Sequence, residues 1–256
     1  MTSIIIYLIF TPYGLIFSRE SLKSEYYLFD LLINNKKEEF LKAKPNQKMW
    51  VIEYEYAFNE PMKEHYFSHP AYDNYPVVAI SREGAELYCK WLTKEANKLN
   101  AQKGKQLIND IRIPTDYEWM YAARGGREKI PYPWGGPYLR NSKGCHLANY
   151  MPEKGNFKAD GAFHTAEVTS YFPNNYGLYC MSGNVAEMIY YHDENKLAGT
   201  KGGSWTSEGQ ELQINDGVDR FKGIITPSVN IGFRPVVTHI TTTKPLTTIQ
   251  KKIKIR

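Results

Sequence analysis

The clearest pattern along the chain is a helical spacing of apolar side chains that starts after Ser81. Apolar residues recur three or four positions apart, at Ala85, Cys89, Leu92, Ala96 and Leu99. This spacing places them on one face of an amphipathic helix, and a serine at the start can cap the free amides of the first turn. The pattern predicts a helix from Ser81 to about Asn100 with a buried stripe.

A second helix is predicted by signals at both of its ends. Residues 115–118, Thr-Asp-Tyr-Glu, form a capping box. In this motif the Thr115 hydroxyl accepts a hydrogen bond from the Glu118 backbone amide, and the Glu118 carboxylate accepts one from the Thr115 backbone amide. Pro114 precedes the box, and Gly125-Gly126 supplies a left-handed residue at which a helix commonly ends.

The segments before Ser81 carry weaker patterns. Residues 21–45 alternate charged residues with leucines, which predicts an amphipathic helical lead-in over residues 21–48. Residues 49–80 are rich in aromatic residues and proline and predict short strands and loops. Within them, residues 77–80, Val-Val-Ala-Ile, are expected to form a buried strand.

No long helix is predicted after Gly126. Residues 127–238 are rich in Gly, Asn, Pro and aromatic residues, and only short apolar runs, at 167–172 and 232–237, predict strands. The chain contains 20 Tyr, 11 Phe and 5 Trp. This content disfavours a helical bundle and favours a loop-rich fold whose tyrosine hydroxyls bond irregular backbone.

The net charge of +5 is confined to one end of the chain. Residues 239–256 contain five basic residues and no acid, so residues 1–238 are neutral. A neutral body excludes a basic nucleic-acid-binding domain as a first interpretation. The segment 239–256 is predicted to be a basic tail, either solvated or in contact with an anionic surface.

Residues 1–20 form an apolar leader. Their apolar runs are typical of the central region of an export signal, although no Lys or Arg precedes them and no A-x-A pattern follows. An apolar N-terminal strand is the alternative. No apolar run reaches the roughly 20 residues of a membrane-spanning helix. The three cysteines, Cys89, Cys145 and Cys180, form no C-x-x-C pair and leave the redox compartment open.

Nine short blocks follow one another in a fixed order. They are Tyr75-Pro-Val-Val78; Tyr88-Cys-Lys-Trp-Leu92; Arg112-Ile-Pro-Thr-Asp-Tyr-Glu-Trp119 with Ala122-Ala-Arg-Gly-Gly126; Tyr132-Pro-Trp-Gly135; Ala148-Asn149; Tyr176-Gly-Leu-Tyr179; Ser182-Gly-Asn-Val-Ala-Glu187; Lys201-Gly-Gly-Ser-Trp205; and Gly232-Phe-Arg234. Together they resemble the sulfatase-modifying-factor, or formylglycine-generating enzyme, family over residues 49–238. The resemblance implies a compact, loop-rich α+β domain related to C-type-lectin-like modules.

Three further stretches resemble a narrower subgroup. They are residues 58–67, 69–76 and 132–145. The subgroup includes the K-type lipoprotein of bacterial gliding motility and type IX secretion. This resemblance implies an exported protein, periplasmic or associated with the outer membrane, with a protein or glycan partner in the cell envelope.

The family's enzymes use a cysteine pair shortly after the Gly-Gly-Ser-aromatic block to bind copper and engage a substrate cysteine. Soft Cu(I) selects thiolates, so the chemistry requires sulfur. Residues 206–213, Thr-Ser-Glu-Gly-Gln-Glu-Leu-Gln, contain no cysteine. We therefore expect no copper and no oxidase activity of this type, and we name no catalytic residue.

The resemblance also implies two calcium sites, since calcium prefers oxygen ligands. The first maps onto the side chains of Asn149 and Asp160 and the carbonyls of Tyr150 and Ala162. The second maps onto position 180, the carbonyls of Gly183 and Val185, and Glu187. Its first ligand is normally Asp or Asn but is Cys180 here, a poor ligand for a hard cation. The alternatives are turn capping by Asn149 and Asp160, and a Glu187 carboxylate that bonds loop amides.

Two residues mark the expected ligand or partner groove, Trp205 and Arg234. Arg234, like Arg112, is expected mainly to make buried bonds to carbonyls or carboxylates, and Trp205 mainly to pack. Three functions follow as hypotheses. The first is a non-catalytic, exported binding or scaffold module. The second is a metal-dependent oxidoreductase in which His164, His192 and a carboxylate converge. The third is a lectin-like glycan binder.

Overall fold

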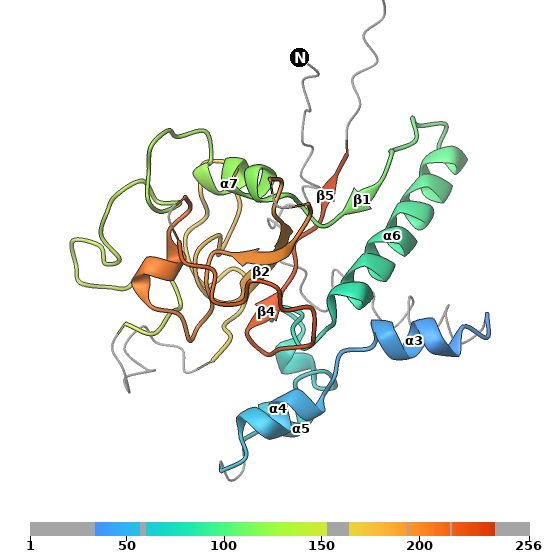
Figure 1. Ribbon diagram of the computed structural model, residues 1–256, viewed down its shortest axis with the longest axis horizontal. Helices are drawn as coiled ribbons and strands as arrows, with labels where there is room; N and C mark the ends of the chain where they lie inside the picture. Colours follow the sequence, from blue (N-terminus) through green and yellow to red (C-terminus); the bar gives the residue numbers. More distant parts are fainter. Residues whose placement is uncertain (1–33, 57–59, 153–163, 194, 216, 239–256) are drawn as a thin grey trace, which may run out of the picture.

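Helix α6 (Arg82–Gln102) is the long helix along one side of the molecule (Figure 1). The computed structural model describes residues 34–56, 60–152, 164–193, 195–215 and 217–238. The Ser81 hydroxyl caps α6 by accepting from the Gly84 amide at 3.0 Å, as predicted. Ala85 and Cys89 are buried, whereas Leu99 is 48% exposed. The predicted stripe is therefore correct near the start of α6 and wrong at its end.

Helix α7 (Asp116–Arg124) confirms the second predicted helix. The Thr115 amide donates to the Glu118 carboxylate at 2.8 Å, and the Glu118 amide donates to the Thr115 hydroxyl at 3.4 Å. Gly125 ends the helix in the left-handed conformation, with φ of 58°. Local capping chemistry was sufficient to place both ends.

The first described part of the chain is helical, so the strands expected in residues 49–80 were wrong. It contains α3 (Lys37–Ala43), α4 (Lys48–Glu53), α5 (Met62–His65) and the 3-10 turn η1 (Pro70–Tyr72). Its aromatic residues pack between short helices, with Trp50 fully buried against Tyr66. Residues 77–80 are buried but form no strand, because Ala79 has a φ of 56°. Residues 1–33, which include the apolar leader and the first part of the predicted lead-in helix, lie outside the described residues, and α3 forms within the remainder of that lead-in.

Two small sheets join distant parts of the chain. Strand β1 (Ile111–Arg112) pairs antiparallel with β5 (Val236–Val237). Strand β2 (Ala186–Tyr190) pairs antiparallel with β3 (Ala198–Lys201) and parallel with β4 (Ile231–Gly232). The predicted strand at 232–237 is thus confirmed in part, at its two ends, while residues 167–172 form turns. Strands β2 and β3 were missed because nearly every residue in them is buried, which removes the alternation that identifies a half-exposed strand.

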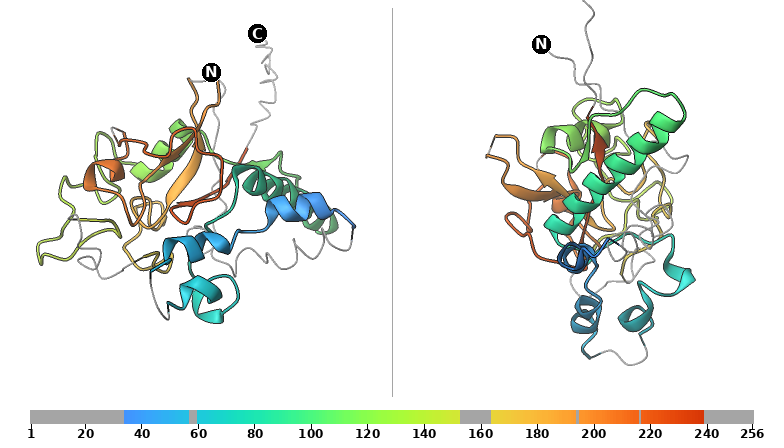
Figure 2. Two further views of the ribbon diagram at one scale, coloured as in Figure 1. Left: turned by 60° about the horizontal axis from the view of Figure 1, so that its bottom comes forward. Right: turned by 90° about the vertical axis from the view of Figure 1, so that its right-hand side faces the viewer.

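Strand β2 separates two parts of the core. Met188 and Tyr190 pack in the cluster built on α6, whereas Ile189 packs against α7 through Trp119. Successive side chains of a strand point to opposite faces, which explains this division. Figure 2 shows α6 and the β2 sheet from the side. One face of β2 therefore packs against α6, and the opposite face packs against α7.

The tract between α7 and β2, residues 125–185, has no helix or strand in its described part. Buried asparagines hold it in place. Asn174 donates to the carbonyl of Ala122 at 2.8 Å, and Asn184 donates to the Ala166 carbonyl at 3.0 Å and accepts from the Ala166 amide at 2.8 Å. The fold is the loop-rich α+β architecture that was expected. Among the described residues, no helix is both long and apolar enough to cross a bilayer.

Candidate functional site

The candidate site begins where β3 leads into the Gly-Gly-Ser-Trp block. Gly202 and Gly203 both have positive φ, 90° and 67°, a region that favours glycine. These two residues turn the chain so that the Trp205 amide donates to the carbonyl of Asn184 at 3.0 Å. The turn brings residues 206–207, at the start of the segment where the family resemblance places the thiol pair, next to the Asn184 loop.

Hydroxyl groups close the loop at the start of this segment. The Ser204 amide donates to the Ser207 hydroxyl at 2.9 Å, and the Ser207 amide donates to the Ser204 carbonyl at 2.9 Å. Thr206 donates through its hydroxyl to the Asn230 side chain at 2.9 Å and accepts from Arg220 at 2.6 Å. Serine and threonine hydroxyls here bond to protein groups, and neither supplies a soft metal ligand.

The space beside this loop is small. A cavity of about 10 Å³ lies between Gly203, Ser207, Glu211 and Arg220. A volume of roughly 10–15 Å³ holds one water molecule. This cavity is therefore too small to admit a peptide side chain.

The three cysteines lie outside this segment. Cys89 and Cys180 are buried, and Cys145 is exposed. Burial raises the pKa of Cys89 and of Cys180 to about 12 each. Both thiols are therefore neutral at pH 7, whereas nucleophilic attack and metal binding require thiolate.

A buried ion pair occupies the core behind the loop. The Arg234 guanidinium donates to the Glu187 carboxylate at 2.6 Å, and the Trp119 indole donates to the same carboxylate at 2.7 Å. Arg234 also donates to the Tyr179 carbonyl at 2.9 Å. Arg112 likewise donates to Glu118 through two nitrogens, each at 2.7 Å. Both arginines thus make the buried or half-buried bonds expected of them.

The second proposed calcium set fits a cation poorly. Arg234 already neutralises Glu187, the neutral Cys180 thiol is a weak ligand for calcium, and the Gly183 carbonyl accepts from the Val185 amide at 3.0 Å. Glu187 is bonded by a guanidinium and an indole, and not by the loop amides of the alternative interpretation. The position is better described as an internal ion pair.

The first proposed calcium set has one feature that fits a cation. The Asn149 amide nitrogen donates to the His164 carbonyl at 2.7 Å, and its Oδ1 is buried without a hydrogen-bond partner. A buried acceptor without a partner is costly unless another group, such as a metal ion, satisfies it. Tyr150 follows directly, whereas Asp160 and Ala162 lie outside the described residues. Their role as ligands stays a prediction.

Trp205 is buried in an aromatic cluster, which agrees with the prediction that its side chain mainly packs. Its ring lies 4.7 Å from the His164 ring, which in turn lies 4.4 Å from Tyr54. Trp205 is 5% exposed and Arg234 is 3% exposed. Neither side chain is presented at the surface in this structure, and a ligand contact by either residue stays a prediction.

Within the described residues, the histidines do not converge with carboxylates. His164 is buried, and His192 is exposed beside Tyr117. Over the ranges that the structure describes, there is no cluster of three or more His, Cys, Asp or Glu side chains that could hold a metal ion. The described residues therefore give no support to the alternative of a metal-dependent oxidoreductase.

The sequence-based search missed the roles of Asn184 and Ser207. Asn184 has a φ of 70°, a left-handed conformation in which asparagine is enriched. Its place directly after Ser182-Gly183 was a usable signal for a turn in which the asparagine side chain bonds nearby loop backbone. Ser207 bonds Ser204 only three residues away, so the Ser204–Ser207 spacing was a usable signal for a local turn, whereas the bond from Thr206 to Asn230, 24 positions away, is visible only in the fold.

His164 predicts a pH-dependent stability. Burial lowers its pKa from 6.5 to about 4, so between these values the unfolded chain binds more protons than the folded one. The contribution of the neutral His164 imidazole to stability is complete above pH 6.5 and is lost as the pH drops toward 4, by about 1–2 kcal/mol once solvent screening is allowed for. We expect His164→Phe to reduce this acid dependence in urea unfolding measured from pH 7 to pH 4.

The matched control is His192→Phe, at an exposed histidine. It should leave the pH dependence unchanged. Equal pH profiles for wild type and His164→Phe would contradict the burial of a neutral imidazole.

The sequence places the protein in a known family. Residues 22–239 match the sulfatase-modifying factor enzyme 1-like domain. The chain therefore belongs to this family. Its loop-rich α+β fold and its Gly-Gly-Ser-Trp turn are the structural features described above for it.

Curated relatives include both active and inactive enzymes. The chain is 31% identical over 174 residues to inactive C-alpha-formylglycine-generating enzyme 2 of Bos taurus, covering 62% of this chain and 49% of the relative. It is 37% identical over 117 residues to the formylglycine-generating enzyme of Mus musculus, covering 44% and 26%. The chain thus spans about half, or less, of the length of these relatives.

CarF is one solved structure that contains a similar chain. PvdO, which comes from Pseudomonas aeruginosa, is another. CarF gives a TM-score of 0.44 at 26% identity, over 67% of this chain and 70% of CarF. PvdO gives 0.47 at 20% identity, over 65% of this chain and 63% of PvdO.

Proposed function

We propose that this protein is a non-catalytic member of its family that acts as an exported binding or scaffold module. One observation carries the proposal. At the start of the segment in which the family's enzymes hold two thiols, this chain has no cysteine and places Thr206 and Ser207 in a closed hydrogen-bonded loop beside a cavity of about 10 Å³. Relatives named as inactive formylglycine-generating enzymes are consistent with a member of this family that lacks the activity.

The setting we propose is a cell-envelope assembly, such as the gliding or type IX secretion machinery. This finer step rests on the resemblance of residues 58–67, 69–76 and 132–145 to the K-type lipoprotein subgroup and on the apolar residues 1–20. It is an analogy between sequences, because a shared fold does not determine a partner.

The test has two arms. In the first, purified protein is incubated with copper and a cysteine-containing sulfatase peptide, with the mouse formylglycine-generating enzyme as the positive control. We expect mass spectrometry to find no aldehyde product with this protein. Aldehyde formation would overturn the non-catalytic assignment.

The second arm is affinity purification of the tagged full chain from the native cell envelope. We expect a defined envelope protein or glycan to copurify and to bind again as a purified component. Recovery of the chain in the cytoplasmic fraction, with no component that binds again, would overturn the proposed location and role.

We also propose one calcium ion at the first site, held by Asn149 Oδ1, the Tyr150 carbonyl, Asp160 and the Ala162 carbonyl. The ion would satisfy the buried Asn149 oxygen. At a calcium concentration of about 100 times Kd the expected stabilisation is about 2.7 kcal/mol. For a chain of this size that corresponds to a rise in Tm of roughly 5–10 °C after chelation and readdition.

Asn149→Ala should abolish this calcium-dependent rise. The matched control is Asn174→Ala, which removes another buried loop asparagine and should lower Tm while keeping the calcium response. An unchanged Tm of the wild type on calcium addition, with no calcium in elemental analysis, would rule out the site.

A further inference from the structure

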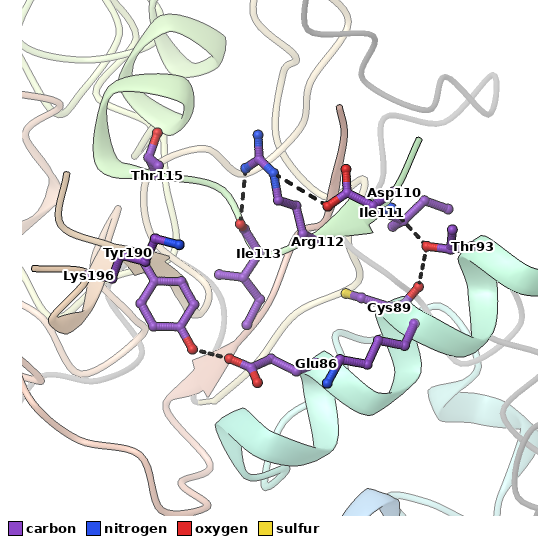
Figure 3. Close-up of a pocket in the computed structure, with 11 residues that line it drawn as sticks. Glu86, Cys89, Thr93, Asp110, Ile111, Arg112, Ile113, Thr115, Tyr190 and Lys196 are labelled. Carbon is purple, nitrogen blue, oxygen red and sulfur yellow. Dashed lines mark hydrogen bonds and ion pairs between the residues drawn. The ribbon is translucent and has the colours of Figure 1, made fainter. Parts of the chain in front are cut away.

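A larger cavity lies on the other face of β2. It has a volume of about 640 Å³ and opens between α6, β1 and the turn that joins β2 to β3 (Figure 3). Tyr190 lines it from β2, on the face that packs toward α6. The Trp205 loop, in contrast, bonds the Asn184 loop through its backbone and shares no lining residue with this cavity. The cavity is therefore separate from the position of the family's thiol pair.

The inner wall of the cavity is apolar. Ile111 and Ile113 are 2% and 3% exposed and line it from β1 and the residues that follow. Cys89 of α6 and the Tyr190 ring complete this wall. In Figure 3, Ile113 lies between Tyr190 and Arg112. Such a surface gains free energy when an apolar group covers it, at about 25 cal/mol per Å².

Most charges around the cavity already have partners. The Tyr190 hydroxyl donates to the Glu86 carboxylate. Arg112 donates to Glu118 at 2.7 Å and lies 4.0 Å from Asp110. Arg112 thus serves Glu118 and lies near Asp110, whereas the neutral Tyr190 hydroxyl holds the Glu86 carboxylate in place and leaves its negative charge.

Two lysines differ from the other charges of the lining. Lys90 of α6 and Lys196 of the β2–β3 turn are both exposed lining residues. Neither makes an ion pair with any residue in the described part of the chain. The cavity thus combines an apolar wall with two uncompensated ammonium groups at its edge.

We propose that this cavity binds a small organic anion with an apolar body, of the medium-chain carboxylate class. Small-molecule sites typically have volumes of about 300–1,000 Å³, apolar walls and a few polar groups that fix orientation. The apolar chain covers Ile111, Ile113 and Tyr190, and the carboxylate lies between Lys90 and Lys196. This site goes beyond the proposed scaffold role and does not depend on it.

The test uses decanoate and two fluorescent probes on the purified full chain. One probe, 1-anilinonaphthalene-8-sulfonate, is an anion with an apolar body, and the other, N-phenyl-1-naphthylamine, is its uncharged counterpart. We expect the folded protein to bind the anionic probe and decanoate to displace it in a saturable manner. No displacement by decanoate would overturn the proposal.

Charge variants test the orientation of the ligand. Lys90→Ala with Lys196→Ala should weaken decanoate and the anionic probe about tenfold and leave the uncharged probe unchanged. Glu86→Gln keeps an oxygen acceptor for Tyr190 and removes a negative charge, so it should tighten both anions severalfold. Lys48→Ala with Lys143→Ala, at exposed lysines outside the lining, is the matched control.

Two outcomes would overturn the assignment of these groups. One is a lysine double variant that binds decanoate as the wild type does. The other is an equal loss of the charged and uncharged probes, which would indicate a general effect on the apolar wall. The measurement requires no envelope partner, so failure here and failure of the scaffold proposal are independent results.

Discussion

Arg234→Ala is expected to lower the free energy of unfolding by about 3–5 kcal/mol, because it leaves the Glu187 carboxylate buried without its counter-charge. Both side chains are almost fully buried, at 3% and 1% exposure. The Trp119 indole alone cannot compensate a full negative charge in that environment. Urea unfolding at pH 7 measures the loss.

Arg112→Ala is the matched control for this prediction. It removes a second two-bond pair with a carboxylate, but the Arg112 side chain is 32% exposed. Solvent can rehydrate the remaining Glu118, so we expect a loss of about 1 kcal/mol. The double change Arg234→Met with Glu187→Leu should recover part of the stability, because no unpaired charge remains. Equal losses of unfolding free energy for Arg234→Ala and Arg112→Ala would contradict the claim that burial makes the Arg234–Glu187 pair costlier to break.

Gly183→Ala is expected to destabilise the fold by about 3 kcal/mol or more. Gly183 has a φ of 78°, and a Cβ at this position would overlap the carbonyl oxygen of Asn149. The Asn184 amide also donates to that carbonyl, at 2.8 Å. Displacement of the Asn149 backbone would thus disturb the crossing of the two loops and any ion held there.

Gly177→Ala separates backbone strain from this overlap. Gly177 has nearly the same φ, 76°, but a Cβ there meets no atom within 4 Å. Its expected cost is only the left-handed conformation of an alanine, about 1–2 kcal/mol. Thermal and urea unfolding of the two variants give the comparison. A Gly183→Ala variant as stable as Gly177→Ala would show that the Asn149 loop can move aside.

Local chemistry made α6 and α7 predictable from the sequence. Ser81, the Thr115–Glu118 box and Gly125 each act within four residues, so their effect does not depend on the rest of the fold. The expectation of a long tract without regular structure after Gly126 was correct for a related reason. Glycine, asparagine and proline favour turns locally.

The remaining errors arise from contacts between distant residues. The aromatic content of residues 49–80 indicated burial correctly but was interpreted as strand, whereas Trp50 and Tyr66 meet across short helices. Strands β2 and β3 gave no alternation because both of their faces are covered. Propensity is a weak guide in such segments, since tertiary contacts decide them.

The sequence was enough to predict that the candidate site has no cysteine pair, but it predicted only part of the contacts that the site makes. The absence of cysteine after Trp205 is visible in the sequence. The partner of Glu187 is 47 positions away, and no local pattern identified a guanidinium in place of a cation. The cavity on the α6 face is likewise formed by residues of α6, β1 and the β2–β3 turn, which only the folded chain brings together.

The pairing of β1 with β5 has a consequence for the order in which the chain can fold during synthesis. Ile111 pairs with Val237, and the cluster around α6 also requires Phe233 and Ile231. A ribosome has therefore released α6 and most of the loop tract before their final partners exist. The domain must close after residue 238 is free, at the entropic cost of a long loop.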